Sequence, residues 1–281
     1  MKQTLRQLIN RALNEDAAFA DVTSRSLIPV SQRSSAAVIA KHDAVVCGLA
    51  VAAMVFRRLD PSMKIQISTR DGRAVKKNQK ILKLTGQTRA ILAGERTALN
   101  ILSHLSGIAT LTRRFVKQAG PSKAKILDTR KTLPGLRDLE KMAVRCGGGT
   151  NHRRDLSDMV LIKDNHLKTA KHHSYPHMIR EVRRKTSKPV EIEIETLGQL
   201  SEALAAGADM ILLDNMTPAQ LRRAVRLRDR LRKKCLLEAS GGITLKSVRA
   251  IARTGVDRIS VGALTHSPSA VDFSLEVEQR P

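Results

Sequence analysis

The sequence predicts an α/β fold in which a small α+β domain precedes a larger barrel of parallel strands. A chain of 281 residues is long enough for a barrel and a second domain, and 42% hydrophobic residues can supply a buried core. From residue 124 onward, short aliphatic runs alternate with helical segments, which is typical of a parallel sheet. The motifs GxGxxG, GxxxxGKS and GxxxxGKT are absent, so a barrel is favoured over an open nucleotide-binding sheet.

The first domain is expected to cover residues 1–107. Strand-like runs are separated by turn signals such as Asp71-Gly72, and they occupy residues 35–42, 63–69 and 79–86. A long helical stretch over 89–120 follows and ends at Gly120-Pro121.

The barrel domain is expected to cover residues 108–266. Its predicted strands lie at 124–131, 158–166, 190–196, 208–215, 235–242 and 257–266. Helical patterns separate the later strands, at 197–207, 217–234 and 244–255. The final segment, 270–281, alternates like an edge strand, and we expect residues 267–281 to return to the first domain.

The formal net charge of +24 leaves two kinds of partner open. A nucleic-acid-binding protein would concentrate its basic residues in one stripe, whereas an enzyme for polyanionic substrates would focus positive potential on a cleft. Lysine and arginine are spread along this chain, and only 2% of its residues are aromatic. The spread favours solvated helix faces, and the scarcity of aromatic rings disfavours a base-stacking surface.

The cysteines and the apolar runs predict a cytoplasmic protein without a membrane segment. Cys47, Cys146 and Cys235 form no CxxC pair, which suits a reducing compartment. The first residues predict an amphipathic helix without the apolar core of a signal peptide. The longest apolar run, 44–56, is shorter than the roughly 20 residues that span a bilayer.

Charged and polar residues follow nearly every predicted barrel strand. Catalytic groups of β/α barrels lie at these strand ends, so a mixed ring of cations and carboxylates is expected there. The ring comprises Asp128 to Lys131, Lys163 to His166, Glu193, Glu195, Asp214, Asn215, Ser240 to Gly242, and Gly262 to His266.

The run VEIEIE over 190–195 is the most informative strand. Alternation places Glu191, Glu193 and Glu195 on one face, either in the barrel lumen or against the helices. Buried carboxylates need cations opposite them, and the predicted partners are Arg130, Lys131 and Lys163. An exposed edge strand with a polar outer face is the alternative.

Two glycine-bearing turns and one glycine-rich loop predict anion binding. Ser240-Gly241-Gly242 and Gly262 follow the last two strands, where barrels commonly bind phosphate through backbone N–H groups. The loop from Cys146 to Arg153 contains three consecutive glycines and ends in His152 and Arg153. Plain turns and a flexible connector are the alternatives.

Six motifs together resemble quinolinate phosphoribosyltransferases, also called nicotinate-nucleotide pyrophosphorylases (carboxylating). They lie in order at 94–112, 127–153, 161–166, 211–216, 237–243 and 259–267. The resemblance runs over roughly residues 15 to 277, and the block 127–153 is its most specific part.

The resemblance implies an N-terminal α/β sandwich domain and an incomplete seven-stranded α/β barrel (TIM-like). It implies a pentosyltransferase that converts quinolinate and phosphoribosyl pyrophosphate (PRPP) to nicotinate mononucleotide, pyrophosphate and CO2, in de novo NAD biosynthesis. Mg²⁺ is the implied cofactor, bound with PRPP. A homodimer with shared active sites is implied, with further assembly left open, and neither nucleic acid nor membrane is an implied partner.

The resemblance also assigns site residues. Lys131, Glu193 and Asp214 are implied to be catalytic, with Glu193 and Asp214 near the metal. The implied substrate-binding residues are Arg96, Thr129, Arg130, Lys131, His152, Arg153, Lys163, Glu193, Asp214, Ser240, Gly241, Gly242, Gly262 and His266. Taken alone, Arg96 would be a solvated helix residue; the resemblance instead places it across a dimer interface.

Two rival functions stay open at this point. The first is a sister enzyme with the same barrel, either nicotinate phosphoribosyltransferase, which takes a monocarboxylate, or a molybdate-locus relative. The second is a basic nucleic-acid-binding protein, which would show tight, salt-sensitive binding. A turnover assay that detects CO2 released from quinolinate tests against the sister enzyme. A gel shift at moderate salt tests for nucleic-acid binding.

Overall fold

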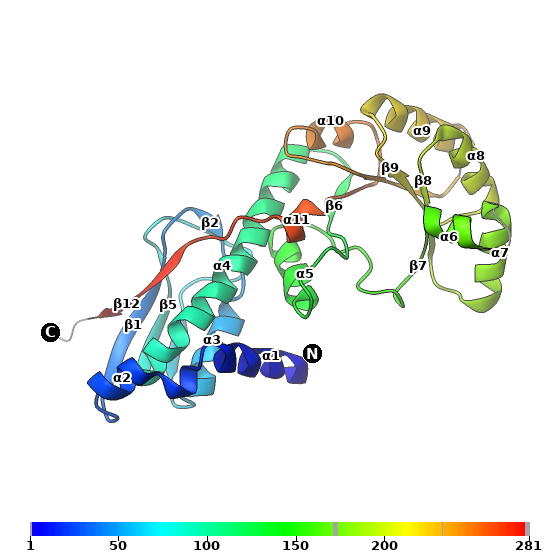
Figure 1. Ribbon diagram of the computed structural model, residues 1–281. Coiled ribbons are helices and arrows are strands. Elements are labelled where there is room, and N and C mark those ends of the chain that lie inside the picture. Colours follow the sequence, from blue (N-terminus) through cyan, green and yellow to red (C-terminus); the bar gives the residue numbers. More distant parts are fainter. Residues whose placement is uncertain (1, 171–173, 232, 279–281) are drawn as a thin grey trace. The chain divides into compact units, whose positions relative to one another are not determined.

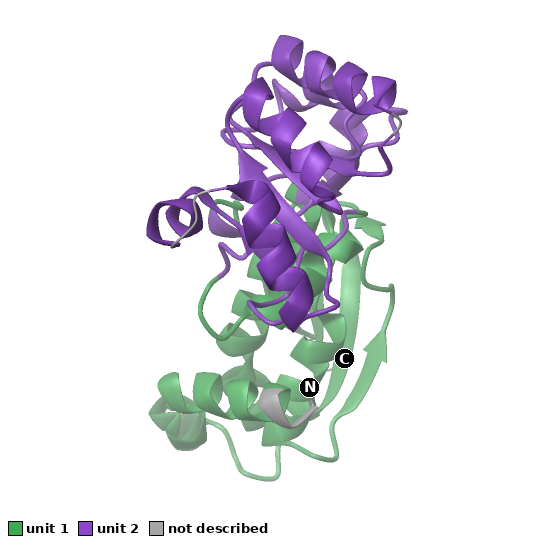
Figure 2. Cartoon of the chain, turned by 90° about the vertical axis from the view of Figure 1, so that its right-hand side faces the viewer, with its two compact units in different colours: residues 1–111, 133–148, 267–281 green, residues 112–132, 149–266 purple. Residues whose placement is uncertain are grey.

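The computed structural model describes residues 2–170, 174–231 and 233–278 (Figure 1). The chain divides into two compact units (Figure 2): unit 1 comprises residues 1–111, 133–148 and 267–281, and unit 2 comprises residues 112–132 and 149–266. The sequence placed a boundary at 107/108, inside the long helix α4 (Thr88–Ala119). The division of the structure differs mainly in giving residues 133–148 to unit 1.

Unit 1 contains a four-stranded antiparallel sheet in the order β12-β1-β5-β3. Its strands are β1 (Arg33–Ala40), β3 (Lys64–Ile67), β5 (Lys80–Gln87) and β12 (Phe273–Glu278). The short strands β2 (Ala44–Val45) and β4 (Ala74–Val75) pair separately. The last strand pairs with the first, with Ala37 opposite Glu276, so the chain returns to the sheet where it began. Residues 279–281 of the predicted final strand lie outside the described residues.

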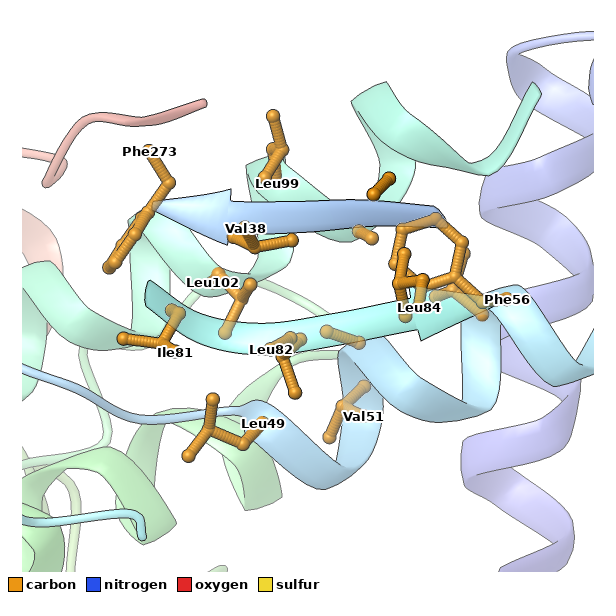
Figure 3. Packing of buried hydrophobic residues seen from close by; sticks show 14 of the residues in the cluster. Val38, Leu49, Val51, Phe56, Ile81, Leu82, Leu84, Leu99, Leu102 and Phe273 are labelled. Atoms are coloured by element: carbon orange, nitrogen blue, oxygen red, sulfur yellow. The ribbon is translucent and has the colours of Figure 1, made fainter. Parts of the chain in front are cut away.

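Helices complete unit 1 and supply half of its core. They are α1 (Lys2–Glu15), α2 (Val22–Leu27), α3 (Leu49–Leu59), most of α4, and α5 (Arg137–Cys146). Figure 3 shows side chains of β1, β5, α3 and α4 packed in one cluster, including Val38, Phe56, Leu82, Leu84 and Leu102. The predicted apolar run 44–56 ends in α3, and this cluster buries the helix's apolar face.

Unit 2 contains six parallel strands in the order β6-β11-β10-β9-β8-β7. The strands are β6 (Lys125–Leu127), β7 (Val160–Ile162), β8 (Val190–Ile194), β9 (Met210–Asp214), β10 (Leu236–Ser240) and β11 (Arg258–Ser260). The helices are α6 (Asp164–Thr169), α7 (Tyr175–Lys185), α8 (Leu197–Ala206), α9 (Pro218–Arg230), α10 (Val248–Ala252) and α11 (Ala263–His266). The predicted alternation of strands and helices is confirmed.

The parallel sheet is an incomplete barrel. Strands β6 and β7 do not pair with each other, and a single parallel bridge from Leu127 to Thr150 adds a seventh strand position beside β6. His152, just beyond that bridge, lies within hydrogen-bonding distance of carboxylates on β8 and β10. An edge segment can reach the middle strands only if the sheet curls, so the expected fold class is confirmed.

Most element ends fall within a few residues of their predicted positions. Two predictions differ more. Of the strand predicted at 257–266, only Arg258–Ser260 is strand, and Ala263–His266 is helical. Of the helix predicted at 244–255, only Val248–Ala252 is α-helical. The side chains of Thr244 and Ser247 each accept the other's backbone N–H, as in a capping box, and the Ser247 N–H also lies 3.1 Å from the Thr244 carbonyl. The residues between them therefore form a tight turn ahead of the helix. None of the helices in the described ranges combines the length and apolar character needed to cross a bilayer.

Candidate active site

A cavity of about 820 Å³ opens at the carboxyl ends of the unit 2 strands. Its volume is within the range of small-molecule sites. Of the predicted binding residues, all except Arg96 line it: Thr129, Arg130, Lys131, His152, Arg153, Lys163, Glu193, Asp214, Ser240, Gly241, Gly242, Gly262 and His266. Barrel geometry brings them together because parallel strands end at one edge.

The segment after β6 supplies the first cations of the cavity. The Thr129 hydroxyl accepts the backbone N–H of Lys131 at 3.1 Å, and the Thr265 hydroxyl of α11 donates to the Lys131 carbonyl at 2.7 Å. These contacts fix the turn on which both cationic side chains stand. The Nε of Arg130 is buried and has no hydrogen-bond partner among the described residues, so this guanidinium keeps a donor for an anion.

Strand β7 ends in Lys163, which pairs with a carboxylate of β8. Its Nζ lies 3.0 Å from Oε2 of Glu193, and both side chains keep some exposure to the cavity. Strand β8 lies between β7 and β9, so the alternative of an exposed edge strand is wrong. Glu191 and Glu193 point to the lumen side, and the prediction that Lys163 opposes a carboxylate of this strand is confirmed.

A buried cluster of one imidazole and two carboxylates lies below the cavity mouth. The Nε2 of His152 is 3.1 Å from Glu191 and 3.2 Å from Glu238, and both carboxylates are fully buried. The backbone N–H of His152 donates to buried Asp128 at 2.8 Å, which holds the ring in place. The cation opposite Glu191 is therefore His152, and not the arginine or lysines expected from the sequence.

Burial and charge shift the proton affinities of this cluster. Burial alone would lower the pKa of His152, but hydrogen bonds to Glu191 and Glu238 outweigh it and raise the pKa to about 9. Burial and the nearby charge of Glu238 raise the pKa of Glu191. The cluster thus keeps protons that the isolated groups would release.

Arg153 adds a second guanidinium close to that of Arg130. Its side chain is only 8% exposed, and its guanidinium donates to the Met159 carbonyl at 3.2 Å. Burial and the neighbouring charge of Arg130 lower its pKa. Two adjacent guanidinium groups in one cavity favour an anion between them.

The ends of β9 and β10 form the opposite wall around a strained turn. Asn215 has a φ of +53°, and its backbone N–H donates to the Ser240 carbonyl at 2.9 Å. Its side chain donates to Asp214 Oδ2 at 2.8 Å. Gly241 has a φ of +95°, and a Cβ there would lie 2.1 Å from Asn215 Oδ1. The position therefore requires glycine, which leaves the backbone open to a ligand.

Comparison with known proteins agrees with this geometry. Models of the N-terminal and C-terminal domains of quinolinate phosphoribosyl transferase match residues 21–106 and 108–276. The chain belongs to the quinolinate phosphoribosyltransferase family. A nicotinate-nucleotide pyrophosphorylase (carboxylating) of Mycobacterium leprae is 40% identical over 97% of this chain and 96% of its own. A quinolinate phosphoribosyltransferase (decarboxylating) of Nicotiana tabacum is 40% identical over 98% of this chain and 82% of its own.

Solved structures extend the agreement to three dimensions. The nicotinate-nucleotide pyrophosphorylase of Francisella tularensis superposes with a TM-score of 0.93 at 39% identity, over 99% of this chain and 97% of that one. A human nicotinic acid phosphoribosyltransferase gives a TM-score of 0.66 at 13% identity, over 93% of this chain and 73% of that one, and shows the fold alone. The superposition with the Francisella tularensis structure covers both the antiparallel N-terminal sheet and the parallel barrel of this chain.

Arg96 lies in unit 1, on α4. It lines a separate cavity of about 350 Å³ together with Asn100, His104 and Leu139. His104 in turn pairs with the buried Glu140 of α5 at 2.8 Å. The binding role that the family resemblance implies for Arg96 stays a prediction.

Three contacts of the site were not predicted from the sequence. Glu191 and Glu238 are the partners of His152, and Asn215 lies against Gly241. The signal for Glu191 was present, since strand alternation put it on the face of Glu193. No local pattern reveals Glu238 or Asn215, because their roles depend on neighbouring strands.

Proposed function

We propose that this chain catalyses the family reaction: quinolinate and PRPP give nicotinate mononucleotide, pyrophosphate and CO2, a step of de novo NAD biosynthesis. The observation that carries the proposal is the convergence of Arg130, Lys131, Arg153 and Lys163 on one cavity in a chain of this family. Quinolinate is a dianion and PRPP is a polyanion, so a cationic cavity selects both.

We assign the two carboxylates of quinolinate to the cations at the β6 and β7 ends. Arg130 and Arg153 are adjacent, and Lys163 stands across the cavity with Glu193. Within the described part of the chain, the buried Nε of Arg130 has no hydrogen-bond partner. Guanidinium groups bind carboxylates through two parallel hydrogen bonds, which fixes the orientation of the pyridine ring.

We assign the phosphates of PRPP to the ends of β10 and β11. Ser240, Gly241 and Gly242 offer backbone N–H groups after β10, and Gly262 and His266 line the same wall after β11. A Cβ at Gly262 would lie 3.2 Å from the side chains of Lys131 and His266, so glycine leaves room for both. Thr129 orders the Lys131 turn, and Lys131 then faces the leaving pyrophosphate.

We assign the carboxylates of Glu193 and Asp214 to the sugar of PRPP. As the bond to pyrophosphate breaks, positive charge develops on the ribosyl carbon, and nearby carboxylates stabilise it. The pyridine nitrogen attacks that carbon and becomes cationic. The positive nitrogen then stabilises the carbanion left on the ring carbon when the adjacent carboxylate departs as CO2. That carbon takes up a proton to give the product, so no protein nucleophile takes part.

The residues fit a Mg²⁺ ion that arrives with PRPP. Glu193 and Asp214 each use one oxygen in a hydrogen bond, to Lys163 and to Asn215, and keep oxygen ligands of the kind Mg²⁺ prefers. Neither belongs to a three-ligand cluster within the described parts of the chain, which suits an ion bound mainly by substrate phosphates. When bound, the ion neutralises the charge of the pyrophosphate group.

Two further expectations belong to this proposal. We expect a homodimer in which Arg96 of one subunit completes the site of the other, supported by the family resemblance alone. We also expect cytoplasmic residence, supported by thiol cysteines at positions 47, 146 and 235.

The test is a turnover assay with quinolinate labelled in the carboxylate that is lost. We expect release of labelled CO2 that requires PRPP, and no comparable product when nicotinate replaces quinolinate. Turnover of nicotinate alone would overturn the substrate assignment in favour of the monocarboxylate enzyme.

A further inference from the structure

Two cysteine thiols and one carboxylate come together in unit 1, and the proposed reaction uses none of them. The ligand atoms of Cys47, Asp71 and Cys146 all lie within 4.8 Å of one another. Cys47 is fully buried, whereas Cys146 is half-buried. Elsewhere in the chain, Cys235 is buried and belongs to no such cluster of described residues.

Backbone contacts hold Cys47 in place. It follows β2, and its N–H donates to the Ser106 hydroxyl of α4 at 3.0 Å. The next residue, Gly48, has a φ of +103° and begins α3. The thiol is therefore presented from a rigid junction between a strand and a helix.

Cys146 stands at a junction that can adjust. It is the last residue of α5, and three glycines follow it, of which Gly148 has a φ of +91°. The Asp71-Gly72 turn packs against it so closely that a Cβ at Gly72 would lie 3.1 Å from the Cys146 carbonyl oxygen. Glycine residues allow the backbone to move by small amounts at little energetic cost.

We propose that Cys47 and Cys146 form a modification site at which a low-molecular-weight disulfide oxidises the two thiols to a reversible disulfide bond. The Cys146 thiolate attacks one sulfur of the small disulfide, whose S–S bond breaks and releases one thiolate. Cys47 then gives up its proton and attacks Cys146 Sγ, releasing the second small thiol. Two protein thiols are oxidised, and one small disulfide is reduced to two thiols.

Exposure decides which sulfur reacts first. Only Cys146 is accessible, so it meets the small disulfide, and buried Cys47 resolves the adduct. The hydrogen bond from Cys47 lowers the pKa of the Cys146 thiol, and the same hydrogen bond together with burial raises the pKa of Cys47. Both directions agree with this order, since the thiolate is the nucleophile.

A zinc site is the competing use of these three groups. Asp71 Oδ1 already accepts the N–H groups of Gly48 and Leu49, at 3.0 and 3.1 Å. Structural zinc takes four protein ligands, and the cluster of described residues offers three. Oxidation needs only the two sulfurs, which favours it.

The bridge would act on the proposed active site, and this consequence rests on the proposed function. His152 and Arg153 follow Cys146 after the three glycines. A disulfide draws two sulfurs to about 2.05 Å, and a displacement of about 1 Å passed along the chain can weaken substrate positioning severely. We therefore expect the bridged protein to bind quinolinate more weakly.

The first experiment reads the chemistry without any activity assay. The full chain is incubated with oxidised glutathione, its remaining thiols are alkylated, and its peptides are identified by mass spectrometry. We expect a Cys47–Cys146 link in the wild type and in the control Cys235→Ser, removable with dithiothreitol.

Cys47→Ser should stop at a glutathione adduct on Cys146, and Cys146→Ser should form neither link nor adduct at Cys47. Modification of Cys235 at an equal rate, absence of the link, or one bound zinc that blocks oxidation would overturn the proposal.

The second experiment measures quinolinate binding by calorimetry before and after oxidation. We expect at least threefold weaker binding by the bridged wild type, and unchanged binding by identically treated Cys146→Ser. Equal affinity of the bridged wild type would refute the link to the active site. If the reduced protein itself fails to bind quinolinate, the proposed function fails while the cross-linking result stands.

Discussion

Replacing Gly241 with alanine tests the strained turn that carries the proposed phosphate site. The residue has a φ of +95°, and an added Cβ would lie 2.1 Å from Asn215 Oδ1 and 2.8 Å from the Asn215 backbone nitrogen. The backbone conformation costs an L-residue about 1–3 kcal/mol, and the overpacking adds about 1–3 kcal/mol. We expect Gly241→Ala to lower the free energy of unfolding by roughly 2–6 kcal/mol.

The adjacent glycine supplies the matched control. Gly242 has a φ of +57° and open space around the position of a Cβ, so Gly242→Ala bears the conformational term alone. Urea unfolding followed by far-UV circular dichroism gives both free energies. The KM for PRPP should rise more in Gly241→Ala, because Asn215 must move beside Asp214. Equal stability and equal KM in the two variants would refute the argument that Asn215 and Gly241 form one fitted turn.

Three further predictions concern charge and assembly. The pKa of His152 is raised from 6.5 to about 9, so its protonated form adds on the order of 3 kcal/mol to the free energy of unfolding. This stabilisation is complete below pH 6.5 and is lost as the pH rises to 9. In urea unfolding, Glu238→Gln should flatten this fall in stability with pH, and an unchanged slope would contradict the pairing of His152 with Glu238. Arg153→Ala should lower quinolinate turnover more than tenfold while the circular dichroism spectrum stays that of the folded protein. Normal turnover would contradict the assignment of Arg153 to substrate binding. Mixing Arg96→Ala with Lys163→Ala chains should restore part of the activity that each lacks, and no restoration would count against a site shared between subunits.

The fold could be predicted from local patterns because strands and helices of the barrel alternate in sequence. Aliphatic runs such as 208–215 and 190–196 became β9 and β8, buried between neighbours. Helix ends were less predictable, as residues 244–247 show, because the reciprocal hydrogen bonds of Thr244 and Ser247 close a tight turn before the α-helix begins at Val248.

Much of the candidate site could also be predicted, since residues at the carboxyl ends of parallel strands must converge. Convergence at one edge of the sheet does not specify which side chain pairs with which, however. The sequence predicted a cation opposite Glu191, but only the curvature of the sheet reveals that His152 fills the place and that Glu238 shares it. The requirement for glycine at position 241 likewise arises from Asn215, on a different strand end.

A crystal structure with quinolinate bound would show whether the cations of the unit 2 cavity hold the substrate. We predict that both pyridine carboxylates contact these cations, with Arg130, Arg153 and Lys163 within hydrogen-bonding distance. Quinolinate bound with its carboxylates away from these three side chains would contradict it.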